Sequence, residues 1–332
     1  MLFPFIEEFN VYVSFAHLHQ IDLHATPGCL IARARPQPVL PICWLRDSQL
    51  YAVSAGISRP LIILNKAQEK SLVGKILTQR DGSVGTVIIS NQEKYNAMTA
   101  QMWRDLPAHI AELDADPAIR VIVLVGDGDR AFVSGADISQ FGAQRNDPVG
   151  LRRYNEAVDA AYTAPVKAGK PVIAKVRGIC MGGGLGLAAG CDIRICADDA
   201  RFRMPAGRLS LGYDQAGVHR FVSLIGVQNT YDIFFSARIF GADDALRMGF
   251  VSRVVPASEL DEAVQTMASA IADNAPLTAK AVKMTVNAFL EDPANRHSAA
   301  AQAAIDACNA SEDYREGVLA FEQKRKPRFV GR

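Results

Sequence analysis

The chain has 332 residues, of which 49% are hydrophobic and 21% are charged, and its formal net charge is +1. This length and composition allow one or two domains with a large buried core. The near-neutral charge excludes an electrostatic argument for binding nucleic acid or a membrane surface. The six cysteines fit buried thiols in a reducing compartment better than a disulfide framework or a zinc site. We therefore expect a cytoplasmic globular protein.

Residues 1–71 do not show the periodicity of a folded domain. Several prolines interrupt any helix there, and the apolar run Leu61–Leu64 has no partner of matching period. His17, His19 and His24 have no carboxylate or thiol cluster at ligand spacing, so we expect no metal site. The segment does not resemble a signal peptide, and no apolar stretch of the chain is long enough to span a bilayer. We predict a poorly ordered extension outside the folded core.

From Lys75 onward the pattern alternates between strands and helices. The segments Lys75–Thr78 and Gly85–Ser90 predict a hairpin that turns around Arg80, Asp81 and Gly82. A helix with an apolar face is predicted over Thr99–Ala115, with Thr99 as its N-cap. A fully apolar strand then follows at Val121–Val125. These elements indicate an α/β protein.

Helices dominate the rest of the predicted secondary structure. One is expected over Arg153–Ala164, and another over Val218–Ile225, where Gly226 would end it. The last predicted helices are Glu259–Asn274, Leu277–Leu290 and Ala299–Phe321. This order favours an α/β core over residues 72–256 and a helical region over residues 257–332.

The most informative segment is Lys170–Ile195. It predicts a buried strand that ends at Gly178, three consecutive glycines at positions 182, 183 and 184, and then a helix. Consecutive glycines cost conformational entropy, so they are expected where the backbone bends sharply or approaches something closely. At a helix start they also leave N–H groups unpaired, where the helix dipole favours negative charge. The glycines therefore predict an oxyanion site or, alternatively, tight strand–helix packing, and their spacing does not match a dinucleotide-binding turn.

Six segments occur in an order that indicates a known family. They are Asn91–Met98, Val121–Ile138, Lys170–Ile195, Phe202–Arg220, Phe250–Pro256 and Asp313–Arg332. In these motifs the chain resembles the crotonase superfamily, the enoyl-CoA hydratase/isomerase group, over roughly Leu72 to Arg332. The resemblance implies an α/β fold: a crotonase-like spiral of repeated ββα units with a C-terminal helical trimerisation region. It also implies self-association as a trimer or a dimer of trimers.

The resemblance implies that two backbone N–H groups, those of Ala136 and Gly183, hold the oxygen of an acyl-CoA thioester. Two fixed donors would stabilise an enolate without reorganising during the reaction. No metal or separate cofactor is implied, because coenzyme A is part of the substrate. The implied coenzyme A contacts are Lys94, Tyr95, Ala97, Asp137, Ile138, Phe321 and Lys324. For the two lysines, the alternative is a solvated surface charge.

The acid/base residues depart from the family pattern. Hydratases of this family carry two glutamates, and the matching positions here are Gly186 and Ala206. Adding water to a double bond normally needs one group to deprotonate water and another to deliver a proton. One carboxylate, Asp214, falls where dienoyl-CoA isomerases carry an acid/base aspartate. We expect it in a largely apolar pocket, although aspartate is also favoured as a helix N-cap or in a loop.

A single carboxylate that removes a proton from one carbon and returns it to another can move a double bond. The sequence therefore predicts an enoyl-CoA isomerase that uses Asp214. Two alternatives stay open: a hydratase in which Asp214 holds water with Tyr213 or His219, and an acyl-CoA binding protein without catalysis. Arg208 is expected either as an exposed charge or as a partner of Asp214.

Overall fold

The computed structural model describes most of the chain. The described residues are 21–26, 29–34, 40–46, 49–52, 74–140, 147–290 and 298–332. They belong to two compact units, Met1–Val73 and Gly74–Arg332. The boundary lies two residues from the start predicted for the enzyme core. None of the helices described in these ranges combines the length and apolar character needed to cross a bilayer.

The first unit contains a four-stranded antiparallel sheet in the order β1-β2-β3-β4. The strands are Ile21–Thr26, Cys29–Ala34, Leu40–Arg46 and Gln49–Ala52. These strands were not predicted, because the prolines obscure their pattern. Pro27-Gly28, a turn-forming dipeptide between the first two strands, was the available signal. His17 and His19 lie outside the described residues.

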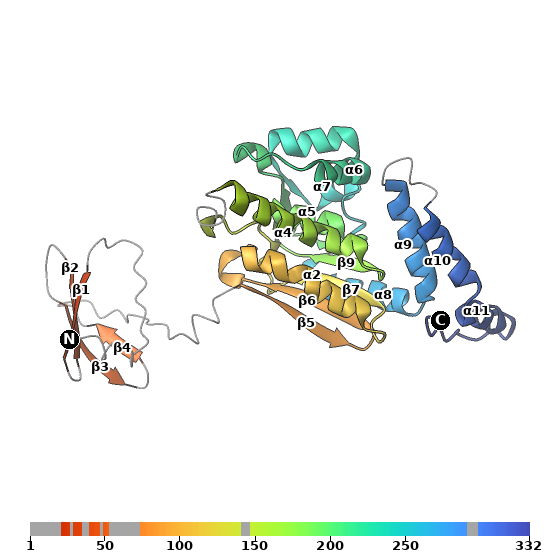
Figure 1. The fold of residues 1–332 in the computed structure, drawn as a ribbon, viewed down its shortest axis with the longest axis horizontal. Coiled ribbons are helices and arrows are strands. Elements are labelled where there is room, and N and C mark those ends of the chain that lie inside the picture. The colour runs from red at the N-terminus through yellow and green to blue at the C-terminus, as the bar shows by residue number, and fades with distance from the viewer. Residues whose placement is uncertain are drawn as a thin grey trace. The chain divides into compact units, whose positions relative to one another are not determined.

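The second unit is built around a six-stranded sheet in the order β14-β11-β9-β7-β6-β5 (Figure 1). In chain order the strands are β5 Lys75–Asp81, β6 Val84–Ser90, β7 Val121–Gly126, β9 Val172–Val176, β11 Ile193–Ala197 and β14 Arg253–Val255. Only β5 and β6 are antiparallel, and they form the predicted hairpin. The other neighbours are parallel, which requires crossovers between them.

Both faces of this sheet are covered, which explains its nearly continuous apolar strands. On one face Val123, Ile173 and Ile195 pack against α8, Leu260–Ala272. The other face packs in one apolar core with α2, Ala100–Ala115. Two further helices complete this layer, α4 Pro148–Lys167 and α5 Gly183–Gly190. The predicted α/β core is therefore confirmed.

A second, smaller sheet has the order β13-β12-β10-β8. Its strands are β8 Ala131–Val133, β10 Ile179–Met181, β12 Arg201–Arg203 and β13 Ile239–Gly241. All are three residues long, too short to show a period in the sequence. Strand β10 follows the predicted strand that ends at Gly178 and precedes the three glycines. Because β10 pairs with β8 and β12, the three glycines lie beside these two strands.

Two helices, α4 and α6, extend over more residues than predicted, and their capping residues explain where they begin. Helix α4 begins earlier than predicted, because Asp147 accepts hydrogen bonds from the N–H groups of Val149 and Gly150 and Pro148 occupies the first turn. Helix α6, Gln215–Ser236, begins after Asp214. It leaves helical geometry at Gly226, where φ is 75°, as predicted, but a helical segment resumes beyond that residue.

The C-terminal helices follow α7, Ala242–Arg247, and α8. They are α9 Pro276–Leu290, α10 Ala299–Asn309 and α11 Glu312–Glu322 (Figure 1). The single helix predicted over Ala299–Phe321 is therefore two helices, because Ser311 accepts a hydrogen bond from the Tyr314 N–H and starts a new one. Helix α9 is fastened to the core by buried Lys283, whose ammonium donates to the carbonyls of Pro165 and Lys170.

A chain that begins at Val73 is expected to fold and to bind acyl-CoA esters as the full chain does. The reason is that Gly74–Arg332 is compact by itself and contains both sheets of the core. Circular dichroism, size-exclusion chromatography and isothermal titration of a CoA ester would check this. Loss of the folded protein in the shortened chain would contradict it.

Candidate active site

Two loops that follow strands of the core are joined at the site. The Met98 N–H donates to the Gly135 carbonyl at 2.8 Å, and the Asp137 N–H donates to the Met98 carbonyl at 2.8 Å. These bonds make a parallel bridge between Met98 and Ala136. In such a bridge the groups of Gly135 and Asp137 face Met98, so the Ala136 N–H points to the opposite side. The loop thereby presents this donor.

The three glycines each have a different structural reason. Gly182 has φ of 50°, a left-handed conformation that starts α5 with a sharp turn. A Cβ on Gly184 would overlap the Val133 carbonyl, so this glycine allows α5 to pack directly on β8. A Cβ on Gly183 would lie 2.9 Å from Cζ2 of buried Trp103. Tight packing, the alternative interpretation of the sequence, therefore explains part of the motif.

The same packing brings the two predicted donors together. A Cβ on Gly135, whose φ is 120°, would lie 3.3 Å from the Met181 carbonyl oxygen and 3.8 Å from the Gly183 nitrogen. As the first residue of α5, Gly183 has an N–H without an intrahelical acceptor. Among the described residues, neither this N–H nor that of Ala136 has a hydrogen-bond acceptor. An oxyanion hole requires unpaired backbone donors of this kind, and that these two form one belongs to the proposed function.

Asp137 fixes the end of the loop that carries Ala136. It is 6% exposed and accepts hydrogen bonds from the Lys94 ammonium at 2.8 Å and from the Ser139 hydroxyl at 2.6 Å. Burial opposes its ionisation, but the bonds from Lys94 and Ser139 outweigh burial and lower the pKa of Asp137. Lys94 therefore already has a carboxylate partner within the chain.

The other predicted coenzyme A contacts fall into two groups. Tyr95 and Ile138, which lie near Ala136 in the two bridged loops, are exposed, and Ala97 in the same loops is buried. The Arg130 guanidinium lies 3.9 Å from the centre of the Tyr95 ring. Phe321, at 86% exposure, and Lys324 lie instead at the end of α11 and beyond it, in the C-terminal tail. These contacts remain predictions.

Tyrosines fill the place of one missing carboxylate. Gly186 is buried in α5, and a Cβ there would lie 2.7 Å from both the Tyr213 hydroxyl oxygen and Cζ of Tyr162. Ala206, the other position without its glutamate, is 7% exposed. A carboxylate at either position would have to be buried. Tyr162, on α4, was not predicted as a site residue, because nothing in the sequence of that helix shows that it faces α5.

Asp214 is the N-cap of α6. Its carboxylate accepts a hydrogen bond from the Gly217 N–H at 2.6 Å, and its side chain is exposed. The expectation of a largely apolar pocket around it is therefore wrong for this chain: an N-cap lies at the end of its helix, where this side chain reaches solvent. Burial raises the pKa of the Tyr162 and Tyr213 hydroxyls, and the nearby negative charge of Asp214 adds to the shift in the same direction. Asp214 thus borders the tyrosines.

In the described part of the chain, neither of the two other polar candidates forms a hydrogen bond or ion pair with Asp214. Arg208 is exposed at the end of a short 3-10 helix, Ala206–Arg208, and the ion pairs found among the described residues do not include it. His219 is exposed on α6 and lines a separate cavity. Tyr213 instead lies beside the middle of α5, at Gly186.

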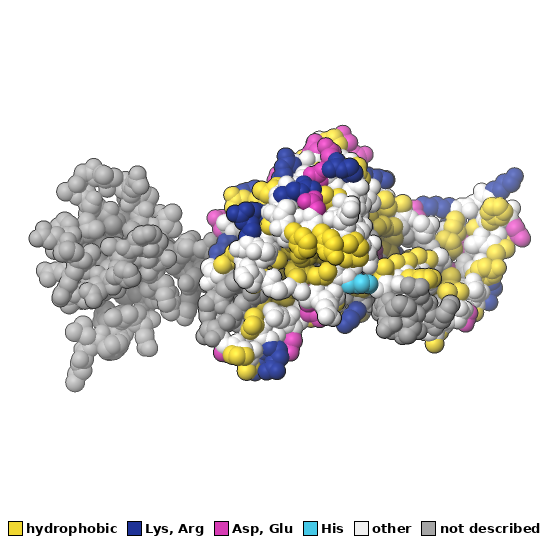
Figure 2. Space-filling model, turned by 90° about the horizontal axis from the view of Figure 1, so that it is seen from above, with side chains coloured by type: hydrophobic (Ala, Val, Ile, Leu, Met, Phe, Trp, Pro, Cys, Tyr) yellow, Lys and Arg dark blue, Asp and Glu magenta, His cyan; other side chains and the backbone are white. Residues whose placement is uncertain are grey.

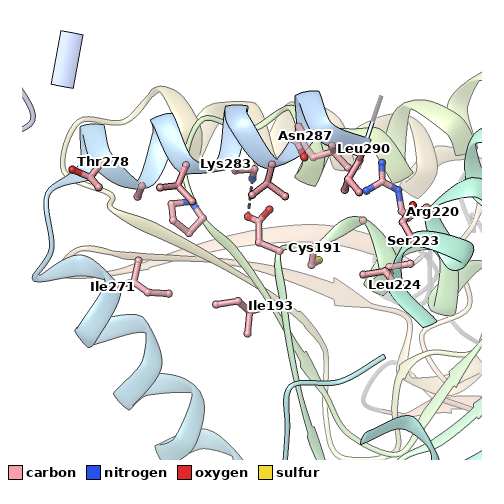
Figure 3. A pocket seen from close by; sticks show the side chains of 18 of the residues that line it. Cys191, Ile193, Arg220, Ser223, Leu224, Ile271, Thr278, Lys283, Asn287 and Leu290 are labelled. Carbon is pink, nitrogen blue, oxygen red and sulfur yellow. Dashed lines mark hydrogen bonds and ion pairs between the residues drawn. The ribbon is translucent and has the colours of Figure 1, made fainter. Parts of the chain in front are cut away.

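That separate cavity has a volume of about 1260 Å³ and lies between α9 and the core (Figure 3). It is lined at the C-terminal end of α5 by Cys191 and Asp192, whereas Gly183 starts the same helix. Lys283 reaches Asp192 across it at 2.8 Å (Figure 3). Burial raises the pKa of Asp192 although Lys283 opposes this. The cavity is thus distinct from the place where the Ala136 loop meets the start of α5. Within the described ranges, no group of side chains could hold a metal ion.

Comparison with known proteins identifies relatives of this architecture. Residues 79–332 match the family model described as enoyl-CoA hydratase/isomerase. The chain is 30% identical over 254 residues to a short-chain-enoyl-CoA hydratase of Clostridium acetobutylicum, covering 76% of this chain and 97% of that protein. It is 34% identical to a peroxisomal Delta(3,5)-Delta(2,4)-dienoyl-CoA isomerase of Arabidopsis thaliana, covering 75% and 94%. The crystal structure of an enoyl-CoA hydratase/carnithine racemase from Magnetospirillum magneticum matches with a TM-score of 0.72 and 33% identity, covering 77% and 96%.

Replacing Gly183 with valine is expected to lower turnover at least ~100-fold, the size of losing one oxyanion donor. The new side chain would collide with Trp103 and shift the N–H of residue 183. The control is Gly241→Val, where a Cβ would meet only a guanidinium nitrogen at 3.9 Å. Steady-state kinetics on a substrate of the unmodified protein would measure both. Near-normal activity of Gly183→Val would show that the N–H of Gly183 is not an oxyanion donor.

Asp137→Asn is expected to lower the free energy of unfolding by about 1–3 kcal/mol at neutral pH, because charge-assisted hydrogen bonds are lost. The folded-state pKa of Asp137 is lowered, so its stabilising effect is present above the ordinary aspartate pKa and is lost as the pH falls through the folded value. The difference between the two proteins should therefore shrink below about pH 4. Denaturant titrations at several pH values would measure it, and a difference independent of pH would contradict the assignment.

Proposed function

The chain belongs to the enoyl-CoA hydratase/isomerase family, and we propose that it moves a double bond in an enoyl-CoA thioester through an enolate intermediate. The Ala136 and Gly183 N–H groups bind the thioester oxygen, and Asp214 transfers the proton. As a member of this family, it is an enzyme of the hydratase/isomerase type. The specific reaction, the acyl-CoA substrate and the role of each residue are the proposal.

One observation supports the enolate most directly. The loop of Ala136 and the first turn of α5 meet, and each presents an N–H that no described residue accepts from. Such donors are pre-organised for an oxygen that becomes negative, and they cost no reorganisation when the charge develops. The start of the α5 dipole adds to the same effect. A thioester carbonyl provides that oxygen when a proton leaves the neighbouring carbon.

The proton transfer rests on Asp214, because the two positions that carry glutamates in family hydratases are Gly186 and Ala206. In the proposed reaction, its carboxylate takes a proton from one carbon, and the electron pair moves into the enolate. The protonated carboxyl group, which is exposed and exchanges its proton with solvent, then delivers a proton to a carbon two positions along, and the double bond comes to lie between different atoms. One carboxylate is sufficient for this sequence of steps.

A hydratase is the second candidate, and the named activity of the Clostridium acetobutylicum relative favours it. Water would then add across the double bond with Asp214 and Tyr213 holding it. A protein that binds acyl-CoA without turnover is the third, motivated by the two absent carboxylates. Incubation with enoyl-CoAs in deuterated water separates the three, because an isomerase exchanges deuterium, a hydratase adds water, and a binding protein does neither.

Self-association belongs to the proposal as well. Exposed apolar side chains recur at helical spacing on the second half of α6, at Val227, Tyr231 and Phe235, with exposures of 51%, 54% and 78%. Apolar side chains gather on the face shown in Figure 2. Contiguous exposed apolar surface marks interaction sites in folded proteins. This supports the assembly implied by the family, a trimer or a dimer of trimers.

Asp214→Asn is expected to lower double-bond migration and α-deuterium exchange by ~100-fold or more, because an amide cannot accept the proton. Asparagine is as good an N-cap as aspartate, so α6 should remain intact. Substrate binding should be nearly unchanged, because the oxyanion donors are untouched. Mass spectrometry of products in deuterated water would measure exchange.

The matched control is Asp147→Asn, which makes the same change at the N-cap of α4. It should leave exchange at the level of the unmodified protein. Undiminished exchange in Asp214→Asn would exclude Asp214 as the proton carrier.

A further inference from the structure

The cavity between α9 and the core contains a cation without a partner in the described part of the chain. Arg220 points from α6 into this cavity (Figure 3). Among the described residues, none forms a hydrogen bond or an ion pair with its guanidinium. The side chain is half-buried, and burial lowers its pKa because apolar surroundings disfavour the charged form. An anion that enters the cavity would therefore stabilise this group.

The charges that line the cavity do not balance. Lys283 and Asp192 form an ion pair of 2.8 Å, so they largely neutralise each other. Asp192 is the only carboxylate among the described residues of the lining, and Arg220 lies beyond ion-pair distance of it. One positive charge is then unmatched. The cavity consequently favours a ligand with one negative charge.

The rest of the lining is mainly apolar. On α9, Val282, Val286 and Leu290 follow one another at four-residue spacing, which places them on one face of the helix. Leu224 and Ile271 line the opposite wall (Figure 3). Exposures of 57% and 50% for Val282 and Val286 show that water reaches this face. A ligand with an apolar body would remove these side chains from water.

The shape of the cavity fits an extended chain. Its volume of about 1260 Å³ exceeds the ~300–1000 Å³ usual for small-molecule pockets. Along α9 it reaches from Thr278 to Leu290, twelve positions apart and therefore about 18 Å along the helix axis. Arg220 lies at the Leu290 end of this length (Figure 3). The charge is thus at one end of the cavity, and the apolar wall extends away from it.

We propose that this cavity is a second ligand site, which binds a carboxylate with an extended apolar chain. The carboxylate lies on Arg220, whose guanidinium binds both oxygens through parallel N–H donors, and the chain lies along α9. A small hydrated anion such as phosphate would leave the apolar wall exposed, and a neutral lipid would leave Arg220 without a partner. The site goes beyond the proposed function, because Gly183 starts α5 whereas Cys191, at the other end of this helix, lines the cavity.

The test is isothermal titration of the full-length protein with decanoate and with 1-decanol, which has the same chain length without a charge. The unmodified protein should bind decanoate roughly tenfold more tightly, the size of one charge-assisted hydrogen bond. Arg220→Gln should abolish this preference, because an amide keeps the polarity of the side chain but not its charge. Arg253→Gln, at an exposed position on β14, is the matched control and should keep the preference.

A second variant makes the test independent of how Arg220→Gln folds. Val286→Asp places a carboxylate on the exposed face of α9, so it should weaken decanoate binding by repulsion at a position that water already reaches. Melting temperatures measured without ligand would show which variants are folded.

Equal affinity for the two probes, or an unchanged preference in folded Arg220→Gln, would overturn the inference. If Arg220→Gln does not fold, unchanged decanoate binding in Val286→Asp would overturn it instead. A failure of decanoate to bind the unmodified protein would do the same, and is the result expected if a second copy of the chain covers the cavity.

Discussion

The close approach of α5 to β8 is the constraint on which the site depends. Gly184 allows it, because any side chain at that position would overlap the Val133 carbonyl. Once α5 lies this close, its first N–H reaches the loop of Ala136, which the Met98 bridge holds from the other side. Two backbone N–H groups from distant parts of the chain then lie on neighbouring segments. A substitution that moves α5 away from β8 would separate the donors even if both residues remained.

Backbone donors suit this chemistry because their positions are set by the fold. The N–H of Gly183 is fixed by a helix and that of Ala136 by a hydrogen-bonded bridge, so neither has a rotamer to adjust during the reaction. Asp137 secures the same loop through Lys94 and Ser139. Asp214, the proposed acid/base group, is instead an exposed side chain at a helix end. In the proposed site, the two donors are thus part of the backbone, whereas the acid/base group is a side chain with rotamers.

The surroundings of Gly186 show what replaces a lost carboxylate. Without a side chain at this position, the hydroxyl ends of Tyr162 and Tyr213 lie over α5. A charged acceptor is thereby exchanged for two neutral donors in a buried space. The site keeps polar character next to the oxyanion hole, but of the opposite hydrogen-bonding sense. At position 186, packing as well as sequence leaves no room for a carboxylate.

Local signals explain which elements were predictable. The β5–β6 hairpin, the Thr99 cap of α2 and the turn at Gly226 were predicted, because each depends on a few neighbouring residues. Strand β10 was missed because three residues show no period, and the break before α11 because the cap at Ser311 was overlooked. The expectation of an apolar pocket around Asp214 was wrong. An aspartate can be an exposed helix cap or a buried acid, and the neighbouring sequence does not distinguish the two.

The sequence by itself determined the family, the α/β core, the glycine-rich helix start and the absence of both carboxylates. These follow from residue types and spacings along one chain. Only the tertiary structure decided that the loop of Ala136 lies beside the start of α5, that Asp214 is exposed, and that the Tyr162 and Tyr213 hydroxyls lie over Gly186. Those facts depend on distances between segments far apart in the chain, and these are set by how α4, α5 and α6 pack together. No local pattern records such distances.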